Sequence, residues 1–465
     1  GWDRAMAKAG ELGEILVDDL SHQGEGIGRL GPEVVFVAGG LPGDRLRIRL
    51  LRRHKGHWCA EIAGIIHPAP DRRRPPCILA DHCGGCSLQP LEDRAQASWK
   101  ARQVSQTLQR IAGLEAPVRP ILEAPMPLGY RNRAIIPLER NTDSCLRAGY
   151  YRRGSHRIVN LNRCPVLDGR IDRLIQPLKL DLEASDWPID RHGGGGLRHL
   201  ALRVGHASGE ILITLVSADE DLPGLAAMAN AWMARWPEVV GVCLNLQEQP
   251  TNRLLGDRTL TLAGRPWLEE GFDGLRYRIG ADTFFQVNTA QAEAVLPSLR
   301  EALGEGSDHD GRDLVDAYCG IGTFSLPLAR QGWRILGLEQ HAPSVELARS
   351  NAALNGLEGL ARFECTPVAA VLAERLRPHS DQEAPLLFLD PPRRGLEPEA
   401  LAALETARPP RIAYLSCDPA TLARDLGRLA GSGAYEVLWL QPIDFFPNTS
   451  PVSYTHLTLP TILLV

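Results

Sequence analysis

The sequence predicts an α/β protein whose C-terminal part is a doubly wound parallel sheet. Two observations support this prediction. Short apolar runs alternate with helical patterns in the last third of the chain, at Asp313–Tyr318, Trp333–Leu338, Pro385–Leu389 and Ile412–Leu415. Strands and helices that alternate in this way are typical of a parallel sheet. Glycines or acidic residues follow the first three runs, and doubly wound sheets bind their ligands at such strand ends.

Residues 10–68 are expected to form a small all-β module. Short β-rich runs are separated by glycine corners, at Glu14–Val17, Glu33–Ala38, Arg45–Arg49 and Glu61–Ile66. This pattern favours a barrel of the OB kind, which often binds nucleic acid. The segments Ser21–Arg29 and Phe36–Asp44 resemble a TRAM domain, and the resemblance implies contact with RNA. A barrel with a purely structural role is the alternative.

Residues 75–270 are expected to form a central α+β domain, and residues 271–465 the doubly wound domain. Apolar residues spaced mostly three to five positions apart predict a helix between Leu91 and Ile111. Alternating strands are expected from Tyr130 onward. Further β-rich runs lie at Leu200–Val204, Glu210–Leu215 and Val239–Asn245.

A cluster of cysteines follows a linker rich in proline and arginine. Five residues separate Cys77 from Cys83, and Cys86 completes a Cys-Gly-Gly-Cys sequence with Cys83. Glycines beside thiolates let backbone amides turn toward the sulfur atoms. Cys164 precedes a proline, as cluster ligands often do, and is the expected fourth ligand of a 4Fe-4S cluster. Zinc is the rival metal, although zinc sites usually pair two short spacings, and thiols without metal are the third alternative.

Charge is distributed unevenly along a chain with a formal net charge of -5. Residues 1–200 carry 30 Lys and Arg against 23 Asp and Glu, whereas the remaining residues carry 21 against 33. A basic first half favours a polyanionic partner, and a solvated charged surface is the alternative. Basic side chains interleaved with tyrosines suit RNA backbone contact and base stacking. The expected RNA contacts are Arg131, Arg133, Arg152 and Arg153.

Composition favours a globular protein of the cytoplasm. A hydrophobic content of 44% and a charged content of 23% are ordinary for such proteins. The first 20 residues are acidic without an apolar segment, so no signal peptide is expected, and no apolar run reaches membrane-spanning length. Ten cysteines without a secretory signal favour metal or catalytic roles over disulfides. RNA is the expected partner of a monomer, with no DNA and no membrane.

The segment after the first strand of the predicted parallel sheet carries Gly320 and Gly322 but lacks the third glycine of a dinucleotide fingerprint. Glu339, at the end of the next strand, is placed to accept hydrogen bonds from ribose hydroxyls. This combination suits a mononucleoside ligand such as S-adenosylmethionine. Asp390, at the end of another strand, is a candidate contact for the cofactor or the substrate. For each motif alone, an ordinary turn with a solvated charge is the alternative.

Cys417 lies between a predicted strand, Ile412–Leu415, and a helix predicted from Ala420 onward. Asp418 is suited to cap this helix, and Pro419 is suited to its first turn. The amides and the dipole at a helix N-terminus favour the thiolate, the nucleophilic form of cysteine. A buried structural cysteine is the alternative, and the neighbouring motifs favour the nucleophile.

Together these motifs resemble the RNA uracil-5 methyltransferases over nearly the whole chain, from the barrel through residue 449. The resemblance rests on the four cysteines named above and on the segments Tyr130–Arg133, Phe284–Asn288, Asp316–Phe324, Leu389–Arg393 and Ser416–Pro419. The barrel and the cysteines look most like the family member that modifies 23S rRNA. The resemblance implies that S-adenosylmethionine is bound by Gln286, Tyr318, Gly320, Gly322, Thr323, Glu339, Thr366 and Asp390.

The resemblance also implies a mechanism. C5 of uracil is a poor nucleophile, so it must be activated before it can accept a methyl group. Addition of the Cys417 thiolate at C6 creates an enolate whose C5 accepts the methyl group. A base must then remove the C5 proton before the cysteine is eliminated. The target uridine must lie in a loop or be flipped out, since a base inside a duplex is out of reach.

The closing motif of the family is incomplete in this chain. Its Phe-Pro and Thr are present within residues 446–449, but Pro451 replaces a His and Ser453 replaces the Glu that is the expected base. No Asp or Glu follows Asp444. The tail from Ser453 lacks the family pattern, and either a frameshift or assembly artefact or a diverged terminus explains it. Two functions stay open: a methyltransferase with impaired proton abstraction, and an RNA-binding iron-sulfur protein without turnover. A uridine of tRNA or another rRNA position is the alternative substrate.

Overall fold

The computed structural model describes residues 7–140, 145–153, 155–189, 195–249, 253–304, 312–379, 381–449 and 461–464. Their contacts group the chain into two compact units. The first unit contains residues 1–100, 151–159 and 446–458, and the second contains 101–150, 160–445 and 459–465. The division into three domains at 10–68, 75–270 and 271–465 stays a prediction.

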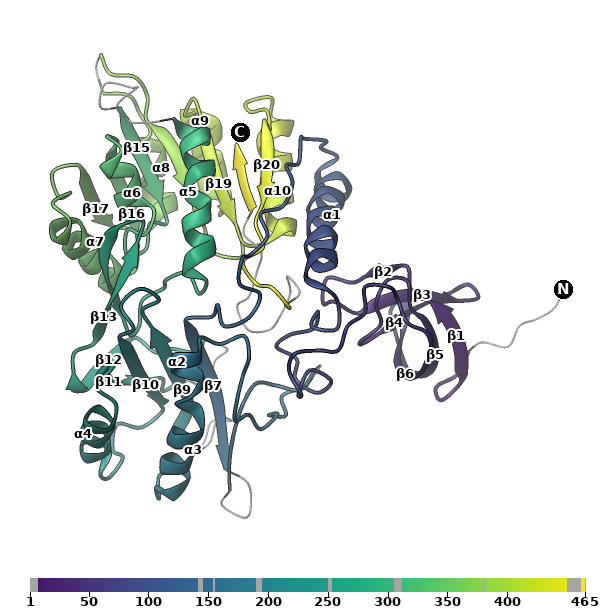
Figure 1. Ribbon diagram of the computed structural model, residues 1–465. Coiled ribbons are helices and arrows are strands. Elements are labelled where there is room, and N and C mark those ends of the chain that lie inside the picture. Colours follow the sequence, from purple (N-terminus) through teal and green to yellow (C-terminus); the bar gives the residue numbers. More distant parts are fainter. Residues whose placement is uncertain are drawn as a thin grey trace. The chain divides into compact units, whose positions relative to one another are not determined.

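The N-terminal part of the first unit is a six-stranded sheet in the order β1-β5-β6-β4-β3-β2 (Figure 1). Its strands are β1 (Leu12–Leu16), β2 (Asp19–Leu20), β3 (Gly26–Leu30), β4 (Glu33–Val37), β5 (Arg45–His54) and β6 (His57–His67). In the first half of β5, buried Leu46, Ile48 and Leu50 alternate with exposed arginines, as expected for a strand with one face on a core. The expected all-β character of this region is confirmed.

The rest of the first unit joins segments that lie far apart in the sequence. Gln96, in helix α1 (Asp93–Ala112), donates to Asn448 Oδ1 at 3.1 Å and accepts from the Asn448 backbone N–H at 2.7 Å. Arg73 donates to the same Oδ1 at 2.6 Å, and the Leu88 N–H donates to the Asn448 carbonyl at 3.0 Å. Because Asn448 is fully buried, these bonds satisfy polar groups that would otherwise destabilise the unit.

The central sheet of the second unit has six strands in the order β12-β11-β10-β9-β7-β8. They are β7 (Arg133–Arg140), β8 (Leu146–Ala148), β9 (Leu197–Val204), β10 (Ile211–Ser217), β11 (Val239–Leu246) and β12 (Arg258–Gly264). Helices α2 (Gly169–Asp172), α3 (Ile175–Ala184) and α4 (Leu225–Arg235) accompany them, and the hairpin β13 (Trp267–Phe272) and β14 (Leu275–Gly280) follows. Every residue of β9 and β10 is buried, which explains why these strands are β-rich runs in the sequence.

The second unit also contains a seven-stranded sheet in the order β17-β16-β15-β18-β19-β21-β20 (Figure 1). Its strands are β15 (Asp313–Ala317), β16 (Arg334–Glu339), β17 (Ala361–Cys365), β18 (Leu386–Leu389), β19 (Ile412–Ser416), β20 (Trp439–Pro442) and β21 (Thr461–Leu464). The first five strands in this order are parallel, and β21 is antiparallel to both of its neighbours. The strand order reverses between β15 and β18, which is where doubly wound sheets bind ligands.

Among the described residues, the helices that accompany this sheet are α5 (Thr289–Leu303), α6 (Ser325–Arg330), α7 (Ala342–Leu354), α8 (Val368–Arg375), α9 (Pro398–Ala407) and α10 (Pro419–Gly431). Helix α8 packs on α9, and α9 packs on α10. Their buried leucines form one core with the leucines of β18. The expected doubly wound α/β fold is confirmed. Within the described ranges, no helix is both long enough and apolar enough to cross a membrane.

Candidate active site

Cys417 lies between the end of β19 and the start of α10, as the sequence predicts. The Asp418 side chain caps the helix, accepting from the backbone N–H of Ala420 at 2.9 Å and of Thr421 at 3.4 Å, and Pro419 is the first helical residue. The Cys417 side chain is partly buried. This is the position, beside a helix N-terminus, at which the sequence predicts the nucleophilic cysteine.

The loop after β15 has an unusual backbone. Tyr318 has a φ of 66°, in the left-handed region that non-glycine residues rarely adopt. Gly320 follows with a φ of 55°, and its N–H donates to Glu339 Oε1 at 3.2 Å. The other Glu339 oxygen accepts from the His341 N–H at 2.8 Å. Glu339 therefore ties the loop after β15 to the end of β16, and the rare conformation at Tyr318 is consistent with a functional loop.

Carboxylates gather at the ends of β15, β16 and β18. Asp316 is buried, and one of its oxygens accepts from the Ser325 hydroxyl at 2.5 Å. Burial raises the pKa of Asp316 to about 7, and the charge of Glu339 contributes. Burial likewise raises the pKa of Asp390, with contributions from Asp316 and Glu339. A cationic ligand would relieve this repulsion.

Two buried polar atoms at the same strand end have no hydrogen-bond partner among the described residues. They are Asp316 Oδ1 and the Tyr318 hydroxyl. Buried polar atoms are normally satisfied by protein or water. Asp316 also lies close to Glu339, whereas the Tyr318 hydroxyl lies near the charges of Glu397 and Asp425. Unpartnered polar atoms of this kind are expected of a site that a polar ligand completes.

Thr366, Gly322 and Thr323, which are also expected to contact the cofactor, lie in segments that follow strands of the parallel sheet. The backbone N–H of Thr366, which follows β17, donates to the Glu339 carbonyl at 2.9 Å. Gly322 has a φ of 85°, and the Thr323 carbonyl accepts from the Tyr277 hydroxyl at 2.9 Å.

Asn132 anchors the segment that contains Gln286, a role that sequence reasoning missed. Its side-chain amide donates to the Gln286 carbonyl and to Thr289 Oγ1, both at 2.9 Å. Its backbone N–H donates to the Val287 carbonyl at 2.9 Å. Asn288 then caps α5 through its side chain. The signal available in the sequence was a polar residue, Asn132, between Arg131 and Arg133.

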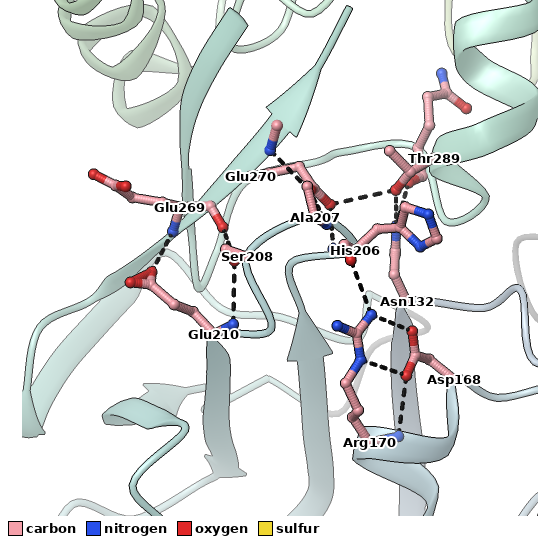
Figure 2. A network of polar contacts seen from close by, with 12 residues as sticks. Asn132, Asp168, Arg170, His206, Ala207, Ser208, Glu210, Glu269, Glu270 and Thr289 are labelled. Carbon is pink, nitrogen blue, oxygen red and sulfur yellow. Dashed lines mark hydrogen bonds and ion pairs between the residues drawn. The ribbon is translucent and has the colours of Figure 1, made fainter. Parts of the chain in front are cut away.

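Figure 2 shows that Asn132 belongs to a larger polar network. Thr289 also contacts buried Glu270, whose carboxylate accepts from the backbone N–H groups of His206 at 2.6 Å and Ala207 at 2.8 Å. Arg170 pairs with Asp168 at 2.8 Å and donates to the His206 carbonyl at 3.1 Å. Burial raises the pKa of Glu270, while the backbone N–H donors lower it. The network therefore fixes the start of α5 and the segment before it.

Three residues of α10 hold the 393–396 loop, which follows β18. Thr421 donates to the first carbonyl of the loop at 3.0 Å, and Arg424 donates to the second at 2.8 Å. Asp425 Oδ2 accepts from the last N–H of the loop at 2.9 Å and from the Tyr414 hydroxyl at 2.7 Å. Sequence reasoning missed Asp425, although an acidic residue within the apolar stripe of an amphipathic helix was the available signal.

The arginines expected to contact RNA fall into both units. Arg131 and Arg133 belong to the second unit, where they lie near each other at the start of β7. Arg152 and Arg153 belong to the first unit, where Arg153 donates to the Ala80 carbonyl at 3.3 Å. Ser453, the position expected for the base, lies outside the described residues.

Three of the expected cluster cysteines belong to the first unit. The amides two residues after Cys77 and after Cys83 donate to the respective sulfur atoms, both at 3.4 Å. Burial raises the pKa of Cys83 to about 11, and the thiols of Cys86 and Cys77 contribute. Cys164 belongs to the second unit. Across the part of the chain that the structure describes, no group of three or more His, Cys, Asp or Glu is arranged to hold a metal ion.

Residues 269–457 match the profile of the tRNA (Uracil-5-)-methyltransferases, and residues 7–56 match the TRAM domain. The chain is 48% identical over 440 residues to an uncharacterized RNA methyltransferase of Parasynechococcus marenigrum, covering 94% of this chain and 93% of the relative. It is 32% identical over 456 residues to an uncharacterized RNA methyltransferase of Halalkalibacterium halodurans, covering 97% of each.

Among solved structures, the tRNA (uracil-54, C5)-methyltransferase of Pyrococcus abyssi, in complex with S-adenosyl-L-homocysteine, matches with a TM-score of 0.72 and 24% identity. The match covers 98% of this chain and 100% of that one, and it shows a shared fold. The extensive identity with the relatives shows more than the fold. The chain belongs to the tRNA (uracil-5-)-methyltransferase family of RNA methyltransferases and carries a TRAM domain.

Proposed function

We propose that this protein transfers a methyl group from S-adenosylmethionine to C5 of a uridine in 23S rRNA, through a covalent bond to Cys417. The observation that carries the proposal is the order of three neighbouring parallel strands, β15, β18 and β19. Tyr318, Asp390 and Cys417 directly follow β15, β18 and β19, respectively. Because parallel strands end at the same sheet edge, the candidate cofactor loop after β15 and the candidate nucleophile after β19 share this edge, with Asp390 after the strand between them.

The cofactor residues of this chain fit S-adenosylmethionine. Glu339 is an acceptor for ribose hydroxyls, while the buried carboxylate of Asp316 and the carboxylate of Asp390 favour a cation. The partnerless Asp316 oxygen and Tyr318 hydroxyl are available for ligand contacts. When bound, S-adenosylmethionine supplies an electrophilic methyl group on a positively charged sulfur.

Cys417 performs the covalent part of the reaction. Its thiolate adds to C6 of the uracil, which forms an S–C6 bond and places the electron pair on an enolate that includes C5. C5 then forms a bond to the methyl carbon as the bond from that carbon to sulfur breaks. A base takes the C5 proton, the C5–C6 double bond forms again, and Cys417 leaves as the thiolate.

The last step is the one that this chain is expected to perform poorly. Ser453 occupies the position of the Glu that the family resemblance identifies as the base, and a serine hydroxyl is a far weaker base than a carboxylate. We therefore expect the methylated RNA to remain attached to Cys417. This expectation rests on the sequence of the closing motif.

The full chain should be incubated with S-adenosylmethionine and unmodified 23S rRNA fragments, followed by a denaturing gel and a 5-methyluridine assay. We expect a denaturant-resistant adduct with little released product. Ser453→Glu should increase product release by roughly 10²-fold or more, the usual contribution of a positioned base. Normal turnover with Ser453 intact would show that another base serves. If neither the adduct nor the product is detected, the proposed reaction is contradicted.

A uridine in tRNA is the second candidate substrate, because the descriptions of the matching family and of the P. abyssi enzyme both name tRNA as the substrate. The same assay with unmodified tRNA separates the two substrates. RNA binding that survives without adduct or product from either RNA would favour the other function, an RNA-binding protein without turnover.

We also propose that Cys77, Cys83 and Cys86 are ligands of a 4Fe-4S cluster. The support is the spacing of the three cysteines in the sequence and the backbone N–H groups that donate to the sulfur atoms of Cys77 and Cys83. No step of methyl transfer is assigned to the cluster. Protein purified without oxygen should contain about four iron atoms per chain. Cys83→Ser should lose this iron, and Cys164→Ser tests the fourth ligand. Wild-type protein without iron would contradict the cluster.

A further inference from the structure

Three arginines of the second unit lie in or beside the central sheet. Arg133 in β7 lies directly opposite Arg203 in the antiparallel strand β9, and side chains of directly opposed residues lie on the same face. Arg131 lies two residues before Arg133, just ahead of the start of β7. The charge of Arg131 lowers the pKa of Arg133, and the charge of Arg133 lowers the pKa of Arg203. Arg133 therefore lies close to both of the other arginines. We refer to these three residues as the arginine cluster.

The arginine cluster has no counter-ion within the described ranges. None of its members is within ion-pair distance of a carboxylate there, whereas Arg170 of the same unit pairs with Asp168 (Figure 2). Arg203, which is 5% exposed, donates through one terminal nitrogen to the Gly280 carbonyl at 2.7 Å and to the Thr283 carbonyl at 2.9 Å. Its other terminal nitrogen and Arg131 Nε are buried without a partner.

The electrostatics of the cluster are unfavourable in the protein alone. Burial lowers the pKa of Arg133 to about 10, and the charge of Arg131 contributes. Burial and Arg133 lower the pKa of Arg203, which Asp282 offsets in part without forming an ion pair. Like charges held together away from water destabilise a folded protein unless an anion joins them. An anion bound at the cluster would offset this repulsion.

We propose that the arginine cluster binds a phosphate of the substrate RNA. Guanidinium groups present paired donors that match phosphate oxygens. The cluster adjoins Asn132, which is bonded to the segment 286–289, where Gln286 is an expected cofactor contact. A phosphate held there would place the RNA backbone beside this segment. The inference rests on the proposed function and adds Arg203, together with a ligand class, to the RNA contacts expected at Arg131 and Arg133.

The arrangement predicts opposite effects of one substitution on stability and on RNA binding. Arg133→Gln removes a charge that is repelled by its neighbours, so the protein without RNA should unfold about 1–3 °C higher. The same change should weaken RNA binding and reduce the slope of log affinity against log salt concentration by about 0.7, the value for one phosphate contact on a single strand. The measurements are thermal unfolding without RNA and RNA titration at several salt concentrations.

Arg258→Gln is the matched control, because Arg258 lies in the same sheet and is paired with exposed Glu220. This variant should leave the salt slope unchanged, and it should not raise the unfolding temperature. Arg203→Lys keeps the charge and should retain most of the salt slope, while Arg203→Gln should lose it. Inorganic phosphate should raise the unfolding temperature of the wild type more than that of Arg133→Gln.

An unchanged salt slope, or a lower unfolding temperature, in Arg133→Gln would overturn the phosphate site. A loss of S-adenosylmethionine affinity with unchanged RNA binding would overturn it too, because the cluster would then serve the carboxylate of the cofactor. These outcomes leave the proposed reaction intact, since the wild-type adduct assay measures it separately. A wild type that binds no RNA would overturn both.

Discussion

Cys417→Ala should abolish both the denaturant-resistant RNA adduct and the formation of 5-methyluridine. Without the thiolate, C5 of uracil stays a poor nucleophile. Removal of a covalent nucleophile lowers the rate by a factor on the order of 10⁴–10⁶. The measurement is single-turnover incubation with S-adenosylmethionine and RNA, with the adduct resolved on a denaturing gel.

The control variant for this substitution is Cys145→Ala, which removes an exposed thiol of the same unit. It should form the adduct at the wild-type rate. Cys417→Ala itself should retain its affinity for RNA and for the cofactor, because the thiol makes its main contribution after binding. An adduct that persists in Cys417→Ala would show that another residue is the nucleophile.

Asp425→Asn should slow adduct formation by about 10²-fold, the loss expected when a reacting group is displaced by about 1 Å. Asp425 is fully buried and accepts hydrogen bonds from the 393–396 loop, from Tyr414 and from its neighbour Arg424. An asparagine there has one acceptor oxygen and turns an NH₂ group toward donors. The loop after β18 should therefore shift relative to the helix that begins beside Cys417.

Tyr414→Phe is the matched comparison, because it removes one donor to Asp425 and leaves the contacts with the loop. It should slow the adduct by less than threefold. The rate should be expressed per molecule that binds cofactor, with the unfolding temperature measured alongside, so that loss of folded protein is not counted as loss of positioning. Wild-type adduct rates in Asp425→Asn would show that Asp425 contributes to stability alone.

The sequence alone predicts those parts of the fold that neighbouring residues determine. Asp418 caps α10 and Pro419 begins it, as expected from their types, because capping depends on residues within one turn. The buried strands of the parallel sheet were recognisable as apolar runs for a similar reason. The metal cluster expected from the spacing of Cys77, Cys83 and Cys86 stays a prediction.

Other features depend on contacts that local patterns do not encode. The opposition of Arg133 and Arg203, which lie 70 positions apart in the chain, is set by the register of β7 against β9. The roles of Asn132 and Asp425 follow from the loops that pack against them. Each is a polar residue whose function is visible only when its tertiary partner is known.

The first unit is built from segments that lie far apart in the sequence, and this has a consequence for synthesis on the ribosome. Gln96, Arg73 and Leu88 all bond to Asn448, so their partner emerges more than 300 residues after they do. During that interval the nascent chain exposes the donors and acceptors around Leu88 to solvent or to chaperones. The N-terminal sheet can form early, since all of its strands precede residue 68. The segment next to the cysteines, by contrast, reaches its final hydrogen bonding only after the ribosome has passed Asn448 and the peptide has cleared the exit tunnel.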